Sequence, residues 1–303
     1  MKQLQRYYFP ITQVFALWLG IFLLCTLPTY AQQSVKSSCS EKFVASKCVG
    51  DLSQMIPTLR QANVVYLGET HDSSKDHQNQ LKIIQELYQH NPKIAIAMEM
   101  FQRPYQGILD QYITGKLTEK ELLEKSEYEK RWRIPWENYA PILRFAQKKQ
   151  LPVLALNTPS EITRKVAQQG LESLTLSERQ KIPPFSEIRT DNKEYRQSLL
   201  AVFQQHQAVN NGGNSSDVDR FFLAQVLWDE TMAEGIAKFL KSHPDYQVVV
   251  LAGQGHVVYG YGIPSRVLRR LKGKVIQRSV LLSPPEEAST KDKAIADFIL
   301  AEN

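Results

Sequence analysis

Four short runs of apolar residues, each followed at once by polar residues, stand out along the chain. They cover residues 64–67, 94–98, 152–156 and 248–252. Continuous rather than alternating apolar character is typical of strands buried on both faces, as in a parallel sheet. Residues 274–282 form a fifth candidate strand. The pattern therefore predicts a mostly parallel sheet.

Helical periodicity fills the intervals between these strands. Apolar residues share one face of predicted helices over about 75–90, 136–149 and 217–241. Residues 160–216 carry no strand signal and contain breaker segments, which predicts a helical insertion there. The alternation of strands and helices predicts an α/β fold, with a central sheet covered by helices on both faces.

The first residues of the chain have the pattern of a secretory signal. Lys2 and Arg6 make a short positive end, residues 11–27 are mostly apolar, and Ala31 lies where a signal peptidase would cut. An uncleaved anchor is the alternative, because the apolar run is near the shortest length that spans a bilayer. Cys25 follows a leucine rather than a small residue, which argues against a lipid anchor. We therefore expect residues 1–31 to be a signal peptide of an exported, periplasmic or cell-envelope protein.

Two cysteines remain after the predicted signal. Cys39 and Cys48 lie nine positions apart in a segment over 32–60, and in an oxidising compartment we expect them to form a disulfide. Two thiols alone do not complete a zinc site. The α/β domain is then predicted over 61–282, followed by a polar, peripheral tail over 283–303.

Composition and charge exclude several classes of protein. The 303 residues are 43% hydrophobic and 22% charged, as in ordinary globular proteins rather than disordered chains. The 37 basic and 31 acidic residues give a net charge of only +6. A nucleic-acid-binding protein would carry a denser basic stripe, so we expect no nucleic-acid partner.

Polar side chains capable of chemistry follow the predicted strands. Glu69 and His71 come after the first strand, Glu99 after the second, Asn157 after the third and His256 after the fourth. In an open α/β sheet the carboxyl ends of the strands meet at one crevice, where ligands bind. The sequence therefore predicts two imidazoles, two carboxylates and an amide in one cleft.

A Gly-x-x-His motif occurs twice, at 68–71 and 253–256, each time directly after an apolar strand. Glycine at positions 68, 253 and 255 is explained by a turn that needs either a positive φ or a close backbone approach. A single such histidine is more often a hydrogen-bonded cap than a functional group, but the repetition favours a functional role. Asp229, in the predicted long helix, is expected either to face the cleft or to cap a neighbouring loop.

Residues 131–136 read Arg-Trp-Arg-Ile-Pro-Trp. Two tryptophans and two arginines in six residues form a flat apolar wall with cationic edges, which suits a planar anionic ligand. Arg133 and Trp136 are the candidate contacts. Core tryptophans with surface arginines are the alternative interpretation.

Together these motifs resemble the ChaN-like haem-binding uptake family, in the superfamily of the Tiki proteases and erythromycin esterases. The resemblance rests on an ordered set of short motifs over about 64–270: Gly-Glu-Thr-His-Asp at 68–72, Met-Glu-Met-Phe at 98–101, Ala-Leu-Asn-Thr-Pro at 155–159, Gln-x-x-x-Asp-x-x-Met-Ala at 225–233 and Gly-Gln-Gly-His at 253–256. It implies an α/β fold with two related halves, each ending in Gly-x-x-His, and a surface haem site for iron acquisition.

The resemblance implies first an exported protein that binds exchangeable haem in the cleft. Arginines would meet the propionates, a tyrosine or histidine would ligate the iron, and an outer-membrane haem receptor or a homodimer would be the partner. The candidate haem contacts are Tyr259, Tyr261, Tyr139, Arg133, Trp136, His71 and His256.

The alternative is a hydrolase in the same cleft. By similarity to the hydrolytic relatives, Glu69, His71, Glu99 and His256 would either ligate a divalent metal or act as acid and base, with Asn157 and Asp229 in support. No His-Glu-x-x-His or Gly-x-Ser-x-Gly motif is present. A third interpretation is that the cleft is inactive and the protein only contacts a partner in the cell envelope.

Overall fold

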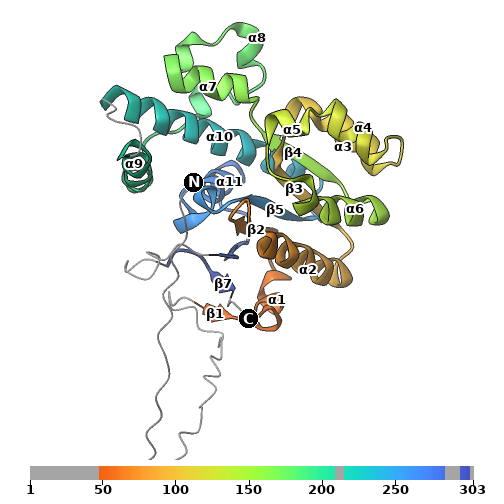
Figure 1. Cartoon of the computed structure of the whole chain (residues 1–303). Coiled ribbons are helices and arrows are strands. Elements are labelled where there is room, and N and C mark those ends of the chain that lie inside the picture. Colours follow the sequence, from red (N-terminus) through yellow and green to blue (C-terminus); the bar gives the residue numbers. More distant parts are fainter. Residues whose placement is uncertain (1–47, 209–214, 284–293, 301–303) are drawn as a thin grey trace, which may run out of the picture. The chain divides into compact units, whose positions relative to one another are not determined.

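The computed structural model describes residues 48–208, 215–283 and 294–300 (Figure 1). The predicted signal at 1–31 and Cys39 lie outside these residues, so the disulfide to Cys48 stays a prediction. Among the described residues, no helix is both long and apolar enough to cross a membrane.

A seven-stranded sheet organises the described residues. Its strand order is β1-β7-β6-β2-β5-β3-β4, and every pairing is parallel. The predicted α/β fold with a mostly parallel sheet is thus confirmed. The strands are β1 (Cys48–Gly50), β2 (Val64–Glu69), β3 (Ile94–Gln102), β4 (Val153–Asn157), β5 (Gln247–Gly253), β6 (Gln277–Leu281) and β7 (Phe298–Leu300).

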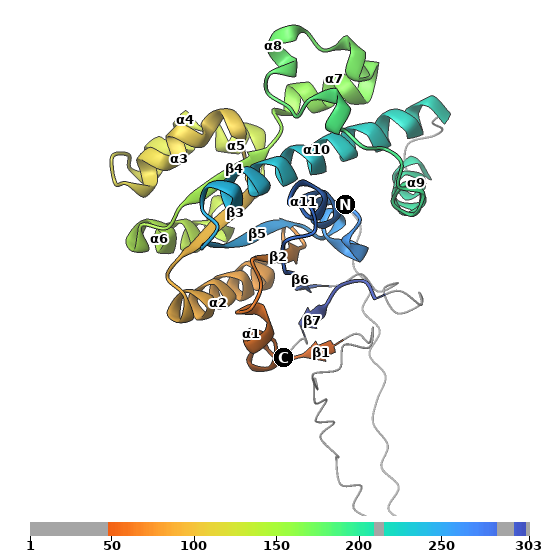
Figure 2. The same ribbon diagram turned by 180° about the vertical axis from the view of Figure 1, so that it is seen from behind.

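Helices cover both faces of this sheet, as expected (Figures 1 and 2). Side chains of β2 alternate between two cores: Val65 and Leu67 pack with α1, α2 and α6, whereas Val64 and Tyr66 pack with α10 and α11. All four are fully buried. The helices are α1 (Leu52–Leu59), α2 (Ser74–His90), α3 (Gln106–Ile113), α4 (Glu119–Lys125), α5 (Tyr128–Arg131), α6 (Ala140–Lys149), α7 (Ser160–Gln169), α8 (Leu176–Arg179), α9 (Lys193–Ala208), α10 (Ser215–Ser242) and α11 (Ile263–Arg270).

The predicted insertion over 160–216 consists, in its described residues, of helices joined by loops. Helices α7 and α9, with loop residues between them, build a third apolar core against the first half of α10, with Ile162, Tyr195 and Phe222 among its buried members. This core gives the insertion a fixed place against α10, so its side chains can contribute to the site.

Two short strands, β1 and β7, were not expected. The end of the predicted polar tail forms β7, whose Phe298 and Ile299 are buried and pair with β1 and β6. Strands of three residues are too short for an apolar pattern to stand out. The second strand also runs further than predicted: Glu99 lies inside β3, which continues past a register shift to pair Gln102 with Asn157.

Candidate functional site

The two Gly-x-x-His turns leave neighbouring strands. β2 and β5 pair in register, and Glu69 lies opposite Gly253. The His71 ring packs directly on Gly253, where an added Cβ would lie 2.9 Å from both Cε1 and Nε2. The expected close approach is therefore found at Gly253, whose φ is −53°. At Gly255 an added Cβ would meet nothing within 4 Å, so this glycine has no such requirement.

His71 is held by the buried carboxylate of Glu69. The distance from Nδ1 to Glu69 Oε1 is 2.9 Å, and the imidazole is 37% exposed. Burial lowers the pKa of His71, but the hydrogen bond to Glu69 and the charge of Glu99 outweigh it, so the pKa is raised. With Nδ1 engaged, Nε2 is the ring atom available to a ligand.

Glu69 is itself held by side chains of two helices. Tyr139, at the start of α6, donates to Oε1 at 2.5 Å, and Gln80 of α2 donates to Oε2 at 2.5 Å. His77 lies beneath, with Nε2 2.9 Å from the His71 carbonyl oxygen. Tyr139, a candidate iron ligand from sequence, is fully buried and committed to Glu69. It orients His71 instead.

His256, at the end of β5, belongs to a second and more deeply buried pair. Its Nδ1 lies 2.7 Å from Asp229 Oδ1, and Tyr195 of the insertion donates to the other oxygen of Asp229 at 2.5 Å. Gln225 lies 3.1 Å from the same ring nitrogen. Asp229 therefore holds His256 from behind the pocket and is not itself among the lining residues. Tyr195 was not among the sequence candidates.

Glu99 lies between the two histidines. Its Oε2 accepts a hydrogen bond from the Gly253 backbone N–H at 2.8 Å, and its Oε1 lies 3.4 Å from His256 Nε2. Asn157 donates to the Glu99 backbone carbonyl at 2.9 Å. Burial opposes ionisation of Glu99, but the charge of His256 outweighs it and lowers the pKa of Glu99 to about 2. Burial likewise opposes protonation of His256, but the charges of Glu99 and Asp229 raise its pKa to about 10.

These groups line a pocket of about 330 Å³. Trp132 stands edge-on to the His71 ring at 4.9 Å between centroids. The pocket is lined by His71, Glu99, Met100, Gln102, Arg131, Trp132, Ile134, Asn157, Thr158, Ser160, Trp228 and His256. It thus combines two imidazoles and a carboxylate with two indoles.

The segment 131–136 does reach the pocket, but through other residues than expected. Trp132 and Arg131 line it, whereas the Trp136 indole donates to Glu119 at 2.8 Å. Arg133 has a φ of 67° and is exposed. This left-handed residue lies between two lining residues, Trp132 and Ile134, and no simple spacing rule anticipates it.

Tyr259 and Tyr261 are not among the residues that line the pocket. Their rings lie 5.5 Å apart, and Tyr261 packs 6.2 Å from Tyr195. Both are half-buried. They support the wall behind Asp229.

The predicted metal set of Glu69, His71, Glu99 and His256 is not assembled. Within residues 48–208, 215–283 and 294–300, no group of three or more His, Cys, Asp or Glu side chains has a geometry that could hold a metal ion. Glu69 lies behind His71 and meets its Nδ1 rather than a shared central point. Each histidine is instead paired with its own carboxylate.

Comparison with known proteins agrees with this fold and with the ordered motifs. The family model described as "Haem-binding uptake, Tiki superfamily, ChaN" matches residues 55–267. The chain therefore belongs to this haem-binding family. A solved structure described as "Cofacial heme binding to ChaN of Campylobacter jejuni" is 22% identical, with a TM-score of 0.64, and covers 82% of this chain and 90% of that chain. This likeness shows a shared fold.

One curated relative comes from a plant. "Protein RETICULATA-RELATED 5, chloroplastic" of Arabidopsis thaliana is 28% identical over 265 residues, which cover 82% of this chain and 35% of that protein. The chain thus spans about a third of the length of this relative.

Gly253→Ala and Gly255→Ala form a matched pair that tests the packing of His71 on β5. The Cβ of Gly253→Ala would overlap the His71 ring, so we expect a loss of about 1–3 kcal/mol in the free energy of unfolding. Gly255→Ala should change it by no more than about 0.5 kcal/mol. Denaturant titration measures both. Equal effects of the two substitutions would contradict the described contact.

The His256 pair predicts a pH dependence of stability. The folded pKa of about 10 lies above the ordinary 6.5, so the contribution of the imidazolium is complete below about pH 6.5 and is lost as the pH rises toward 10. Asp229→Asn removes one negative partner, so it should lower the pKa of His256 and flatten this decline. NMR titration of the imidazole, with unfolding measured across the same pH range, checks both effects. A wild-type His256 that titrates near its ordinary value would refute the pairing.

Proposed function

We propose that this protein binds haem reversibly in the pocket at the carboxyl ends of β2, β3, β4 and β5, with His71 as the axial ligand of the iron. The observation that carries the proposal is the environment of His71. Its Nδ1 is held by Glu69 at 2.9 Å, the ring lines the pocket, and Nε2 has no hydrogen-bond partner among the described residues. A carboxylate on the second ring nitrogen fixes the orientation and raises the basicity of a ligating imidazole.

The pocket walls suit a porphyrin in chemistry. Trp132, Ile134, Met100 and Trp228 supply apolar surface beside His71. Arg133, exposed next to Trp132, is the cation we assign to a propionate. The Arg131 guanidinium is already paired with Glu127 and Glu161, which makes it a structural member of the wall.

The pocket volume of about 330 Å³ is at the lower end for ligand sites. A whole porphyrin is larger, so bound haem would keep part of its surface in solvent. Such a haem would be exchangeable, as uptake requires. When bound, it would supply a ferric iron whose properties depend on the imidazole ligand.

The proposal extends to a role outside the cytoplasm. The signal pattern over 1–31 supports export to the periplasm or cell envelope. We propose uptake of haem for iron, with transfer to or from an outer-membrane haem receptor, or sharing of haem between two copies of the chain.

Haemin titration of the mature chain tests this proposal. We expect a saturable Soret shift that His71→Ala abolishes and that Glu69→Gln weakens by about tenfold or more. Because the iron competes with a proton for Nε2, affinity should fall as the pH drops below the raised pKa of His71.

His90→Ala is the matched control, since this histidine is exposed at the end of α2. It should bind haemin like the wild type. No saturable shift in the wild type, or equal loss in both variants, would overturn haem binding through His71.

A second candidate function, metal-free hydrolysis, is favoured by the charge states of the pocket. With a pKa of about 10, His256 stays an imidazolium at neutral pH and is suited to stabilise an oxyanion. With a pKa of about 2, Glu99 is too weak a base to activate water. His71 would take the proton of the attacking water and return it to the leaving group of a small ester or amide.

Glu99→Gln separates the two candidates. Hydrolysis of p-nitrophenyl acetate and of a peptide library should fall by about 100-fold, because His256 loses the charge that keeps it protonated, while haemin binding is retained. Glu124→Gln, on the exposed surface of α4, is the control. Absence of turnover by the wild type, or turnover untouched by Glu99→Gln, would exclude this candidate.

A further inference from the structure

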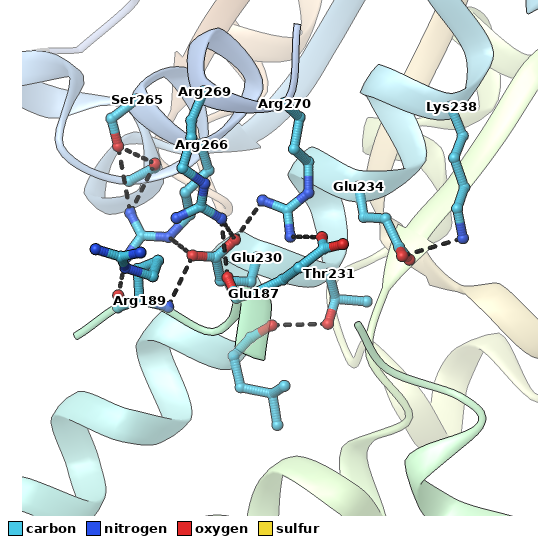
Figure 3. A network of polar contacts seen from close by, with 12 residues as sticks. Glu187, Arg189, Glu230, Thr231, Glu234, Lys238, Ser265, Arg266, Arg269 and Arg270 are labelled. Carbon is cyan, nitrogen blue, oxygen red and sulfur yellow. Dashed lines mark hydrogen bonds and ion pairs between the residues drawn. The ribbon is translucent and has the colours of Figure 1, made fainter. Parts of the chain in front are cut away.

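A second polar cluster lies between α10 and α11 (Figure 3). None of its labelled residues lines the pocket of His71 and His256. Its centre is Glu230, which is fully buried. Arg266, Arg269 and Arg270 of α11 all approach this one carboxylate, with Arg269 Nη2 at 2.7 Å and Arg266 Nε at 3.3 Å. Glu230 follows Asp229 in sequence, so one turn of α10 supplies a buried carboxylate to each cluster, in directions about 100° apart around the helix axis.

Positive charge exceeds negative charge in this cluster. One carboxylate cannot neutralise three guanidinium groups, and two further carboxylates serve other cations as well. Glu187 lies 3.1 Å from Arg270, and Glu234 is shared between Arg103 at 2.7 Å and Lys238 at 3.0 Å. The cationic groups are Arg103, Lys238, Lys241, Arg266, Arg269 and Arg270, against the carboxylates Glu187, Glu230 and Glu234.

Burial raises the free-energy cost of this excess positive charge. The side chains of Arg266 and Arg270 are only 4% and 6% exposed, and Arg270 Nε has no hydrogen-bond partner among the described residues. Like charges crowded away from water repel strongly unless a counter-charge lies among them. The charge of Arg270 also helps to lower the pKa of Arg103, after burial, which is the larger cause.

A pocket of about 270 Å³ opens onto this cluster. We call it the basic pocket; it is lined by Glu187, Glu234, Ala237, Lys238, Lys241, Arg269 and Arg270. Lys241 has no ion-pair partner within the described part of the chain, and Arg269 is 37% exposed. The basic pocket shares no lining residue with the haem candidate site, so the two are separate pockets.

We propose that the basic pocket is a binding site for a phosphate-type oxyanion, either free phosphate or the phosphate of a lipid headgroup. A compact anion of this size and charge offsets the excess positive charge, and guanidinium groups donate in pairs to phosphate oxygens. Lys238 and Lys241 add mobile donors at the mouth of the pocket. Of the two lining carboxylates, Glu187 pairs with Arg270, and Glu234 is shared between Arg103 and Lys238. Lys241 is the lining cation with no ion-pair partner among the described residues, so it carries the strongest claim to the ligand.

Calorimetric titration with inorganic phosphate, and sedimentation with phosphatidylglycerol vesicles against phosphatidylcholine vesicles, tests the site. We expect Lys241→Gln to weaken binding by at least about tenfold, or about 1.4 kcal/mol. Lys241 is exposed, so the variant should fold and should titrate haemin like the wild type. Lys120→Gln, on α4 and 84% exposed, is the control for nonspecific charge.

Phosphate binding that depends on Lys241 would support the site with free phosphate as its ligand. Binding to the anionic vesicles alone, again lost in Lys241→Gln, would support it with a lipid headgroup as its ligand. No binding in either assay, or equal loss in Lys241→Gln and Lys120→Gln, would overturn the proposal. Because none of these readouts involves haem, the result is independent of the proposed haem site.

Discussion

The in-register pairing of β2 with β5 is the constraint on which the site depends. It places Glu69 opposite Gly253, so the two Gly-x-x-His turns leave the sheet side by side. Gly253 then gives the His71 ring a place to pack, and its N–H holds Glu99 between the histidines. A shift of this pairing by one residue would turn each side chain to the opposite face of the sheet. The backbone register of β2 and β5 therefore determines which side chains can meet in the pocket.

The two histidines have similar sequence contexts but different electrostatic environments. His256 is buried between Asp229 and Glu99 and has a pKa of about 10, whereas His71 has one oriented nitrogen and a ring that is 37% exposed. An imidazolium that stays charged at neutral pH and an accessible imidazole can serve different roles in one pocket. This asymmetry supports both candidate functions: it makes His71 the ligand or base, and makes His256 the fixed positive charge.

The local pattern of apolar and polar residues was sufficient to predict the strands that carry the site and the residues at its centre. Glu69, His71, Glu99, Asn157 and His256 follow or end apolar runs, and parallel strands bring such positions together. Tyr195 could not be found this way, and Tyr139 was named only as an iron ligand, because both reach the carboxylates from helices whose docking depends on side-chain packing. Within 131–136, Trp132 rather than Trp136 lines the pocket, and the chain turns between them at Arg133, whose φ is positive. Residue type alone does not encode that turn.

The identity of the iron ligand tests the central claim most directly. We would record visible and electron paramagnetic resonance spectra of the ferric haem complex of the wild type and of His71→Tyr. Our account predicts an imidazole-ligated iron in the wild type and a phenolate-ligated iron in the variant, since both haem ligands are known in proteins. A phenolate signature in the wild type that Tyr259→Phe or Tyr261→Phe removes would contradict the account and would place the haem outside the pocket of His71.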